Sequence, residues 1–548
     1  MSFIDARELP ENAHLTGTVV IVGTGPAGTT VARELAPTGV DILMVEGGSL
    51  GRSPEHDDTL KADQRSQSVE PMEKARTKRL GGASTQWGGR TYPFDALDFE
   101  DRTEGGLNFK GWPISREDLN PFYQRATVAA GVKNMQYTAA QAIEGAPQHL
   151  MGESDLVNTQ GIWRWGPPVN FGDVVTDELA DRGNVRVLHN ANVTHVVQDP
   201  ETGRITELKI QSKPGKFLTV SGDEVVLAMG GLETARLLLN SNVGNENDQV
   251  GRYYTIHPIG EVGKLTMADP KAEGNAVTYT KSHDGVWVRR NLQLHEDVRR
   301  REGLLNMGFA IWYDEPRNPD HGDPLLSSFA LVRKMLTMTG GFKGTGMHRR
   351  YAELENPKAH VLNVVKGLPS VGAFGVHWLR DRILDPRTLP SFTRYSKKGV
   401  YRIRFDAEQA PRAEQRVVLS DSEKDAFGVP RLDVQHFIPE EDRRNYHRSL
   451  ELLAEGINAT GFATYEPPTL EEMLTRPMVD ATHQMGLVRM GSAPEESVID
   501  ENLKVWSSPN LYLSTTGAFT TGGMAGPTLT VIAISIRLAD HLAAKLGL

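Results

Sequence analysis

A chain of 548 residues is too long for one hydrophobic core, so the sequence predicts two or more domains. Hydrophobic residues make up 39% and charged residues 24%, which is typical of a soluble globular enzyme. The formal net charge of −10 disfavours nucleic acid or an anionic membrane surface as a partner. The chain has no cysteine, which excludes disulfides, thiolate nucleophiles and cysteine-ligated metal sites.

Residues 1–7 contain neither the basic nor the apolar segment of a signal peptide. No stretch has the length and apolar purity of a membrane span. Together with the missing cysteines, this favours a cytoplasmic protein. The histidines are scattered, and no group of His, Asp and Glu has metal-ligand spacing, so we predict no metal ion.

The N-terminal stretch Gly17–Glu46 has the pattern of a strand–turn–helix–strand unit. Val19–Val22 is an unbroken β-branched run, typical of a strand buried on both faces of a parallel sheet. A G-x-G-x-x-G turn at 23–28 and a helical segment follow, and then a second apolar strand at Ile42–Val45. This order predicts a dinucleotide site, with a purely structural glycine-rich turn as the alternative.

Each special residue of this unit has a physical reason. Gly23 permits the tight turn, Gly25 lets the backbone reach a pyrophosphate, and Gly28 lets the helix pack close to the strand. The helix N-terminus offers unpaired N–H groups to the phosphates. Glu46, about 20 residues further on, is placed to accept hydrogen bonds from a ribose diol.

The region from Arg79 to Arg90 has one glycine pair before Trp87 and another directly after it. Such glycines let the backbone approach a flat or bulky group closely. We interpret the region as a cofactor contact; a turn anchored by Trp87 is the alternative. Further on, Ser115 and Asp118 form an S-x-x-D box that predicts the start of an amphipathic helix.

Four later segments have strand patterns. Residues 185–188 and 224–228 are short apolar runs, whereas 191–197 and 205–210 alternate around a Thr202–Gly203 turn and predict an antiparallel pair. Gly230 follows the run at 224–228 and leads into a Leu-rich helix, so one nucleotide cofactor would touch two strand ends.

The predicted fold class is α/β. A Rossmann-like nucleotide-binding domain is expected in 1–259, with a cap-like excursion at about 50–180, and it closes with 481–548. Between these parts we expect a substrate-binding α+β domain at 260–480, built on a largely antiparallel sheet, with an insertion at 313–400. Within the insertion we expect a helix at 326–336 and interpret the basic run 394–398 as a solvated loop.

The chain resembles the glucose–methanol–choline (GMC) oxidoreductases, FAD-dependent enzymes that oxidise alcohols. Segments at both ends of the chain carry the resemblance: 23–28 with Glu46, 81–89, Val193, 226–231, 408–411, 416–419, 483–486 and 526–530. Residues 84–87 and 112–115 are most similar to the pyranose oxidase branch. That branch includes bacterial glycoside 3-oxidases, some of which act on C-glycosides.

The resemblance implies FAD as cofactor. Pyranose oxidases of fungi carry a covalent flavin on a histidine where this chain has Gln86, so we expect non-covalent FAD. The cofactor-binding residues expected from the motifs and the resemblance are Gly23, Gly25, Pro26, Ala27, Gly28, Glu46, Gly47, Arg79, Gly81, Gly82, Ser84, Thr85, Gln86, Trp87, Gly88, Gly89, Val193, Ala228, Gly230, Gly517, Pro527 and Thr528.

His483 is the expected catalytic residue, because an imidazole near neutral pKa can take the hydroxyl proton while hydride passes from the carbinol carbon to flavin N5. A core histidine bonded to backbone is the alternative. His257 also matches a family segment, but its context favours a structural role. The family usually places a second catalytic His or Asn where this chain has Gly526.

The expected reaction is oxidation of a secondary ring hydroxyl of a sugar or glycoside, at C2 or C3, to the ketone. A polyol, sugar acid or sterol substrate is the first alternative, and a lyase or non-redox flavoprotein is the second. The electron acceptor, oxygen or another molecule, and the formation of a homo-oligomer stay open at this stage.

Overall fold

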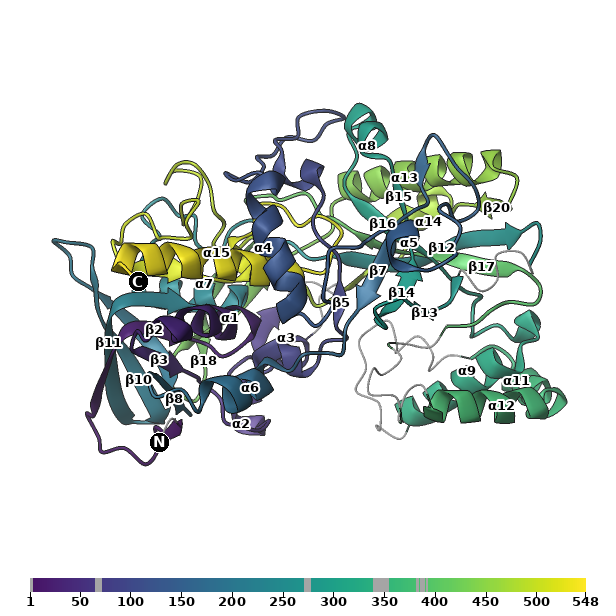
Figure 1. Cartoon of the computed structure of the whole chain (residues 1–548). Helices are drawn as coiled ribbons and strands as arrows, with labels where there is room; N and C mark the ends of the chain where they lie inside the picture. The colour runs from purple at the N-terminus through teal and green to yellow at the C-terminus, as the bar shows by residue number, and fades with distance from the viewer. Residues whose placement is uncertain are drawn as a thin grey trace.

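An eight-stranded, mainly parallel sheet contains the N-terminal strand–turn–helix–strand unit (Figure 1). The structure is a computed structural model that describes residues 3–64, 71–270, 277–338, 354–380, 384, 390 and 393–548. β9 and β10 are antiparallel, as predicted, and so are β10 and β11. The strands, in spatial order, are β1 (Phe3–Asp5), β8 (Val185–His189), β3 (Ile42–Val45), β2 (His14–Val22), β11 (Lys216–Leu227), β10 (Ile205–Lys213) and β9 (Asn192–Gln198), with β22 (Leu511–Leu513) also paired to β11.

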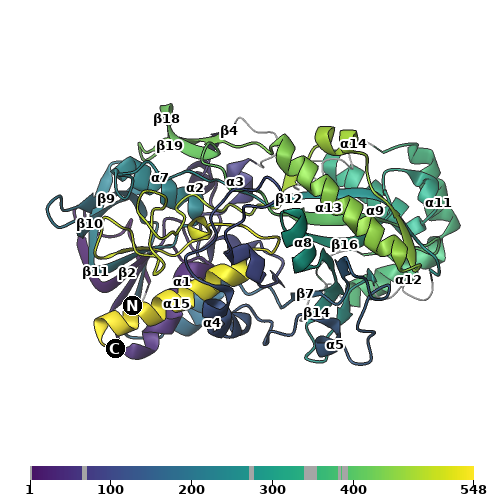
Figure 2. The ribbon, with the colours of Figure 1, turned by 90° about the horizontal axis from the view of Figure 1, so that it is seen from above.

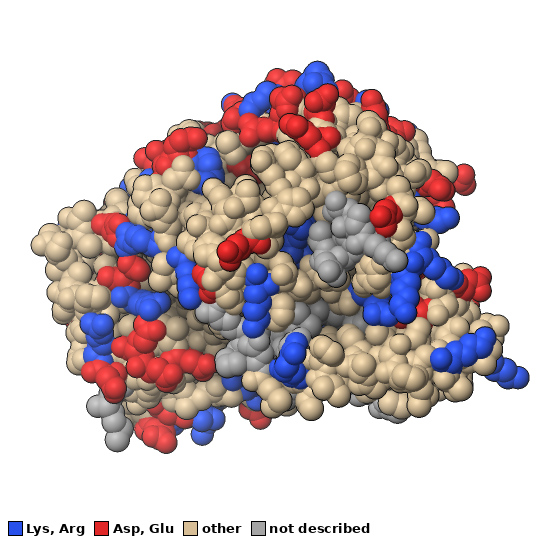
Figure 3. Space-filling model, turned by 45° about the vertical axis from the view of Figure 1, so that its right-hand side comes forward, with Lys and Arg blue, Asp and Glu red and all other residues tan. Residues whose placement is uncertain are grey.

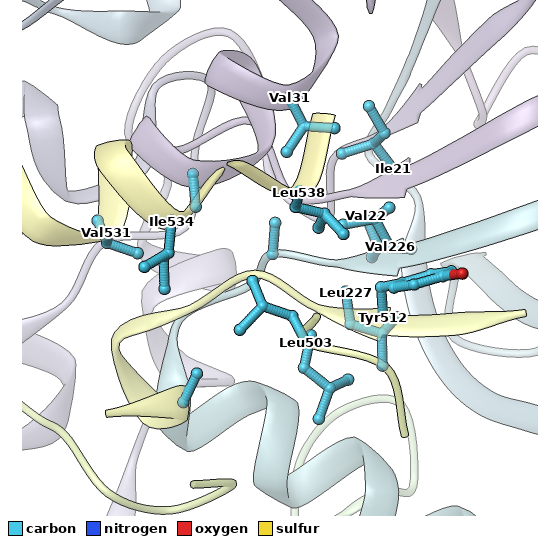
Figure 4. Close-up of a cluster of buried hydrophobic side chains, with 14 of the residues drawn as sticks. Ile21, Val22, Val31, Val226, Leu227, Leu503, Tyr512, Val531, Ile534 and Leu538 are labelled. Atoms are coloured by element: carbon cyan, nitrogen blue, oxygen red, sulfur yellow. The ribbon is translucent and has the colours of Figure 1, made fainter. Parts of the chain in front are cut away.

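The central strands of this sheet are buried on both faces, as their unbroken apolar runs predict. α1 (Pro26–Leu35) and α15 (Thr528–Leu546) cover one face, and α7 (Gly231–Ser241) covers the other (Figure 2). Figure 4 shows the apolar contact between Val22 and Val226 on the strands and Leu538 on α15. Residues of β2 and α1, early in the chain, therefore share one hydrophobic core with residues of the last helix, α15.

A seven-stranded antiparallel sheet forms the second half of the molecule. It alternates residues between two faces: Ile403 and Phe405 point into a core shared with α13 (Glu440–Ala459), whereas Arg404 and Asp406 point the other way. The strands are β20 (Ala463–Glu466), β12 (Pro258–Met267), β17 (Val400–Ala407), β16 (Met307–Tyr313), β15 (Leu292–Leu294) and β6 (Val157–Asn158), with β21 (Val479–Asp480) paired to β12.

Two small sheets join the parts of the chain. The expected excursion at 50–180 supplies strands to each, and its β6 also pairs with β15 of the antiparallel sheet. The predicted domain boundaries at 259/260 and 480/481 stay predictions. One sheet is β13 (Thr280–Lys281), β14 (Trp287–Arg290), β7 (Ile162–Trp165) and β5 (Arg90–Thr91); the other is β18 (Arg416–Lys424), β19 (Pro430–Gln435) and β4 (Ala62–Gln64).

The capping box predicted at Ser115 is present. The Ser115 hydroxyl accepts from the Asp118 N–H at 3.2 Å, and the Asp118 carboxylate accepts from the Ser115 N–H at 2.8 Å. The helix that it opens is α4. The remaining helices are α2 (Pro54–Asp58), α3 (Met72–Ala75), α4 (Arg116–Ala129), α5 (Ala139–Ala142), α6 (Phe171–Val174), α8 (Glu296–Glu302), α9 (Pro324–Met338), α11 (Pro357–Lys366), α12 (Leu368–Leu379) and α14 (Leu470–Thr475).

The described part of the expected insertion is mainly helical, and α9 contains the helix predicted at 326–336. The basic run 394–398 is less solvated than predicted, because Arg394 forms an ion pair of 2.8 Å with Asp323. None of the helices in the described residues has enough length and apolar character to cross a bilayer.

Candidate functional site

A cavity of about 1510 Å³ lies between the two large sheets. It begins at the carboxyl ends of β2, β3 and β11, where ligands bind in open α/β sheets. It continues past His483 and Gly526 to an aromatic wall, and ends against α9 and α12. Segments from both ends of the sequence therefore meet in one continuous space.

The glycine-rich turn has the conformation that its sequence predicts. Gly23 has φ of 105°, which L side chains rarely adopt. A Cβ on Gly28 would collide with the Gly23 carbonyl oxygen, so Gly28 holds α1 against the strand, as predicted. A Cβ on Gly25 would meet nothing within 4 Å, and no side chain caps α1 there. The N-terminus of α1 therefore opens onto the cavity.

Glu46 lies on the cavity wall at the end of β3 and is 6% exposed. Its carboxylate accepts from the Thr24 hydroxyl at 2.6 Å and from the Gly48 N–H at 2.8 Å. A carboxylate has about four lone-pair sites, so capacity remains for further donors.

Most predicted cofactor residues line this cavity. They are Gly23, Gly25, Pro26, Ala27, Glu46, Gly47, Arg79, Gly82, Gln86, Trp87, Gly88, Val193, Ala228, Gly230, Pro527 and Thr528. Six others lie behind its wall: Gly28, Gly81, Ser84, Thr85, Gly89 and Gly517.

Three of these six residues support the backbone of loops next to the cavity. Ser84 donates to the Gly81 carbonyl at 2.6 Å, and Thr85 donates to the Gly82 carbonyl at 2.8 Å. Gly517 packs on Gly231, where a Cβ would lie 2.9 Å from the Gly231 Cα. These contacts support the loops that face the cavity.

His483 lies on the cavity wall and is hydrogen-bonded to a second histidine. Its Nδ1 is 2.8 Å from Nδ1 of His257, and Nε2 of His257 is 3.0 Å from the carbonyl oxygen of Gly522. Sequence reasoning had given His257 a structural role and missed this pairing. The two histidines are 226 positions apart in the chain, so no local pattern links them.

These contacts fix the protons on both rings. A carbonyl oxygen only accepts, so the neutral His257 carries its proton on Nε2 and accepts at Nδ1. His483 must then donate from Nδ1, which leaves a lone pair on its Nε2. A Cβ on Gly526 would lie 3.9 Å from that Nε2, so the missing side chain at Gly526 leaves the basic nitrogen open to the cavity.

Both rings are held neutral. Burial, followed by the neighbouring His257 and by Arg90, keeps the pKa of His483 well below its usual 6.5. Burial also lowers the pKa of His257. Just before His483, Thr482 has φ of 63°, an unfavourable backbone conformation for a β-branched residue.

The cavity wall contains aromatic and charged residues that sequence reasoning missed. Arg90 lies over the Trp163 ring at 4.9 Å, and Arg289 lies over the Trp312 ring at 4.3 Å. Arg404 comes from the alternating strand β17 and also lies over Trp312. The sequence shows that apolar and charged residues alternate in β17, but it does not show that Arg404 lines the cavity.

Models of the GMC oxidoreductase family match residues 101–259 and 411–535, together more than half of the chain. The chain belongs to the GMC oxidoreductases. As a member, it is an FAD-dependent enzyme that oxidises CH–OH groups.

Several relatives cover different parts of this GMC oxidoreductase. The 2-methyl-1,2-propanediol dehydrogenase of Mycolicibacterium austroafricanum is 23% identical, with 96% of this chain and 95% of that protein covered. The C-glycoside 3-oxidase of Microbacterium trichothecenolyticum is 30% identical over 132 residues, 24% of this chain and 25% of that protein. A fungal aryl-alcohol oxidase has the same fold, with a TM-score of 0.55, 15% identity, and coverage of 98% of this chain and 100% of that one.

The residues of the GMC oxidoreductase cavity fit FAD. Gly25 leaves open space at the N-terminus of α1, where a pyrophosphate would accept from backbone N–H groups. Two buried polar atoms on the wall, Asn192 Oδ1 and Gln484 Nε2, have no hydrogen-bond partner within the described residues. A bound cofactor with donors and acceptors along its length would satisfy them.

Proposed function

We propose that this chain oxidises a secondary ring hydroxyl of a sugar or glycoside, at C2 or C3, to the ketone. The observation that carries the proposal is the open Nε2 of His483, whose lone pair faces the cavity because His257 fixes the proton on the other nitrogen. The C-glycoside 3-oxidase relative supports the substrate class. Aromatic rings beside guanidinium groups also suit a sugar, which has apolar ring faces and hydroxyl groups at its edge.

The residues in this proposal have distinct parts. His483 Nε2 takes the proton of the substrate hydroxyl as general base. His257 is a positioning residue: its Nδ1 accepts from His483 Nδ1 before and after the proton arrives, and the bond becomes charge-assisted afterwards. FAD, when bound, accepts the hydride from the carbinol carbon. His257 is fully buried, so the Nδ1 side of His483 is shielded from solvent while its Nε2 faces the cavity.

FAD is held without a covalent bond in this proposal. Gln86 lines the cavity where a covalent link would need a nucleophile, and its amide is not one. The pyrophosphate would lie at Gly25 and the ribose at Glu46, while the N-terminus of α15 at Thr528 would face the flavin. Treatment with acid or denaturant would therefore release the flavin into the supernatant.

Anaerobic bleaching of the flavin absorbance tests the substrate class. Glucose, an O-glucoside, an aromatic C-glucoside and 2-methyl-1,2-propanediol would each be added to the holoenzyme. We expect a sugar or glycoside to bleach it fastest, and the rate of recolouring in air to show whether oxygen is the acceptor. Bleaching by the diol alone would overturn the sugar proposal. No bleaching while dithionite still reduces the flavin would favour a non-redox flavoprotein.

Replacing His257 tests its positioning role. In His257→Leu, His483 loses the acceptor that fixes its tautomer, so we expect flavin reduction to slow at least about tenfold. His257 also lowers the pKa of His483, so its removal should raise that pKa. A general base must be unprotonated, and the acid limb of the pH–rate profile would then move to higher pH. In the unmodified enzyme, the acid limb should lie well below pH 6.5, so the rate should stay constant as the pH falls from 7 to 6.5.

His257→Gln is the matched control for this substitution. Its amide oxygen can accept from His483, and its NH₂ can donate to the Gly522 carbonyl, which reproduces both bonds of the histidine. We expect this variant to recover most of the rate. Equal slowing in both variants, with no movement of the acid limb, would show a role for His257 in folding only.

A further inference from the structure

The three helices α9, α11 and α12 leave large apolar side chains in solvent. Sixteen such residues are exposed within the described part of the chain, and nine of them lie on these helices, three on each. Met338 on α9 is 75% exposed, Leu368 at the start of α12 is 60% exposed, and Val376 on α12 is 70% exposed. Scattered exposed apolar residues are normal, but this concentration marks an interaction surface.

The charged side chains of these helices are all basic. They contain Lys334, Lys358 and Lys366, and not one Asp or Glu, whereas Arg333 on α9 lies over the Phe329 ring on the cavity side. The whole chain has a net charge of −10, so this surface differs in sign from the rest of the protein. In Figure 3 the lower right of the molecule, where the helices lie, is mainly tan with several Lys and Arg side chains. The net charge of the whole chain therefore hides a local basic and apolar face.

The helices also occupy one end of the molecule. Figures 1 and 2 place them far from both chain termini and from the large parallel sheet. The inner faces of α9 and α12 line the cavity, through Phe329 on α9 and Phe374 and Trp378 on α12. On the described residues of these helices, the outer face is consequently exposed to solvent while the inner face of α9 and α12 serves the cavity.

We propose that the outer face of α9, α11 and α12 docks on an anionic lipid bilayer. Helices that lie in a membrane interface combine exposed apolar residues with basic residues, and both features occur on these three helices, which contain no Asp or Glu. A symmetric contact with a second copy is disfavoured, because it would bring the lysines of two such surfaces together. Docking would turn the helix-lined end of the cavity towards the lipid. This inference does not depend on the proposed substrate.

Vesicle flotation with the full-length holoenzyme tests the docking surface. We expect binding to vesicles of phosphatidylcholine mixed with phosphatidylglycerol, weaker binding to phosphatidylcholine alone, and release by high salt. The double variant Lys358→Glu/Lys366→Glu should bind the anionic vesicles at least about tenfold more weakly, since each basic residue near such a surface contributes about fivefold. Val365→Glu and Val376→Glu should each weaken binding as well.

Val128→Glu is the matched control, because Val128 is 64% exposed but lies on α4, away from these helices. It should leave vesicle binding unchanged. Flavin content and melting temperature report that each variant is folded. The absence of flotation for the unmodified holoenzyme would overturn the proposal. So would a stable dimer without lipid that the helix variants dissociate, because the face would then be a protein interface.

Discussion

His483→Asn should lower the rate of flavin reduction by the best substrate by about 10²–10⁴-fold, the usual contribution of a general base. The asparagine NH₂ can still donate to His257 Nδ1, so the buried pair keeps its hydrogen bond while the basic nitrogen is lost. We therefore expect unchanged FAD content and an unchanged melting temperature. Stopped-flow spectroscopy under anaerobic conditions measures this rate directly.

A second buried histidine provides the control. His436 is also buried, with its pKa lowered to about 3, and its Nε2 lies 2.9 Å from Gln409 Oε1, but it does not line the cavity. His436→Asn should change the rate of flavin reduction per bound flavin by less than about twofold, since a residue outside the site does not touch the reacting atoms. If both variants slow the reaction equally, His483 is not the base.

The parts of the fold that the sequence predicts best are those made by neighbouring residues. The unit from β2 to β3 depends on a turn, a helix and two strands within the 32 residues from His14 to Val45, and each has its own local signal. The Ser115 cap is equally local. The resemblance then brought together residues from both ends of the chain, and most of these line one cavity.

The features that sequence reasoning missed depend on long-range pairing. β5 and β7 have two and four residues, and they pair across more than 70 positions, so neither has a period long enough to detect. His257 lies in a segment without catalytic pattern, and only the fold places it beside His483. The alternating apolar and charged residues of β17 predict a strand, but only the position of α13 decides which face of that strand is buried.

A buried ion pair between Arg102 and Glu408 ties the first half of the chain to the antiparallel sheet. The guanidinium donates twice, at 2.7 and 2.6 Å, and the two side chains are 3% and 0% exposed. Asp98 lies beside them, where burial and then the charges of Asp95 and Glu408 raise its pKa to about 7. Arg102 and Arg299, which pairs with Asp95 at 2.9 Å, are thus the cations that balance a buried acidic cluster.

Arg102→Ala should lower the free energy of unfolding by about 3–5 kcal/mol, because it leaves Glu408 buried and unpaired. Urea unfolding at saturating FAD measures this change. Arg102 also lowers the pKa of the buried Asp98, so its removal would raise that pKa further, and the folded variant would bind more protons than the unfolded chain. The loss should consequently be larger at alkaline than at mildly acidic pH.

Two comparisons isolate the buried charge as the cause. Arg125 pairs with Asp540 on the surface, where both are more than two-fifths exposed, so Arg125→Ala should cost under about 1 kcal/mol. The double variant Arg102→Met/Glu408→Gln removes both charges, and its amide oxygen still accepts from the Asn306 N–H that Glu408 binds at 2.9 Å. It should recover more than half of the loss, because no unpaired charge is then buried at position 408. A double variant as unstable as Arg102→Ala would instead assign the loss to packing.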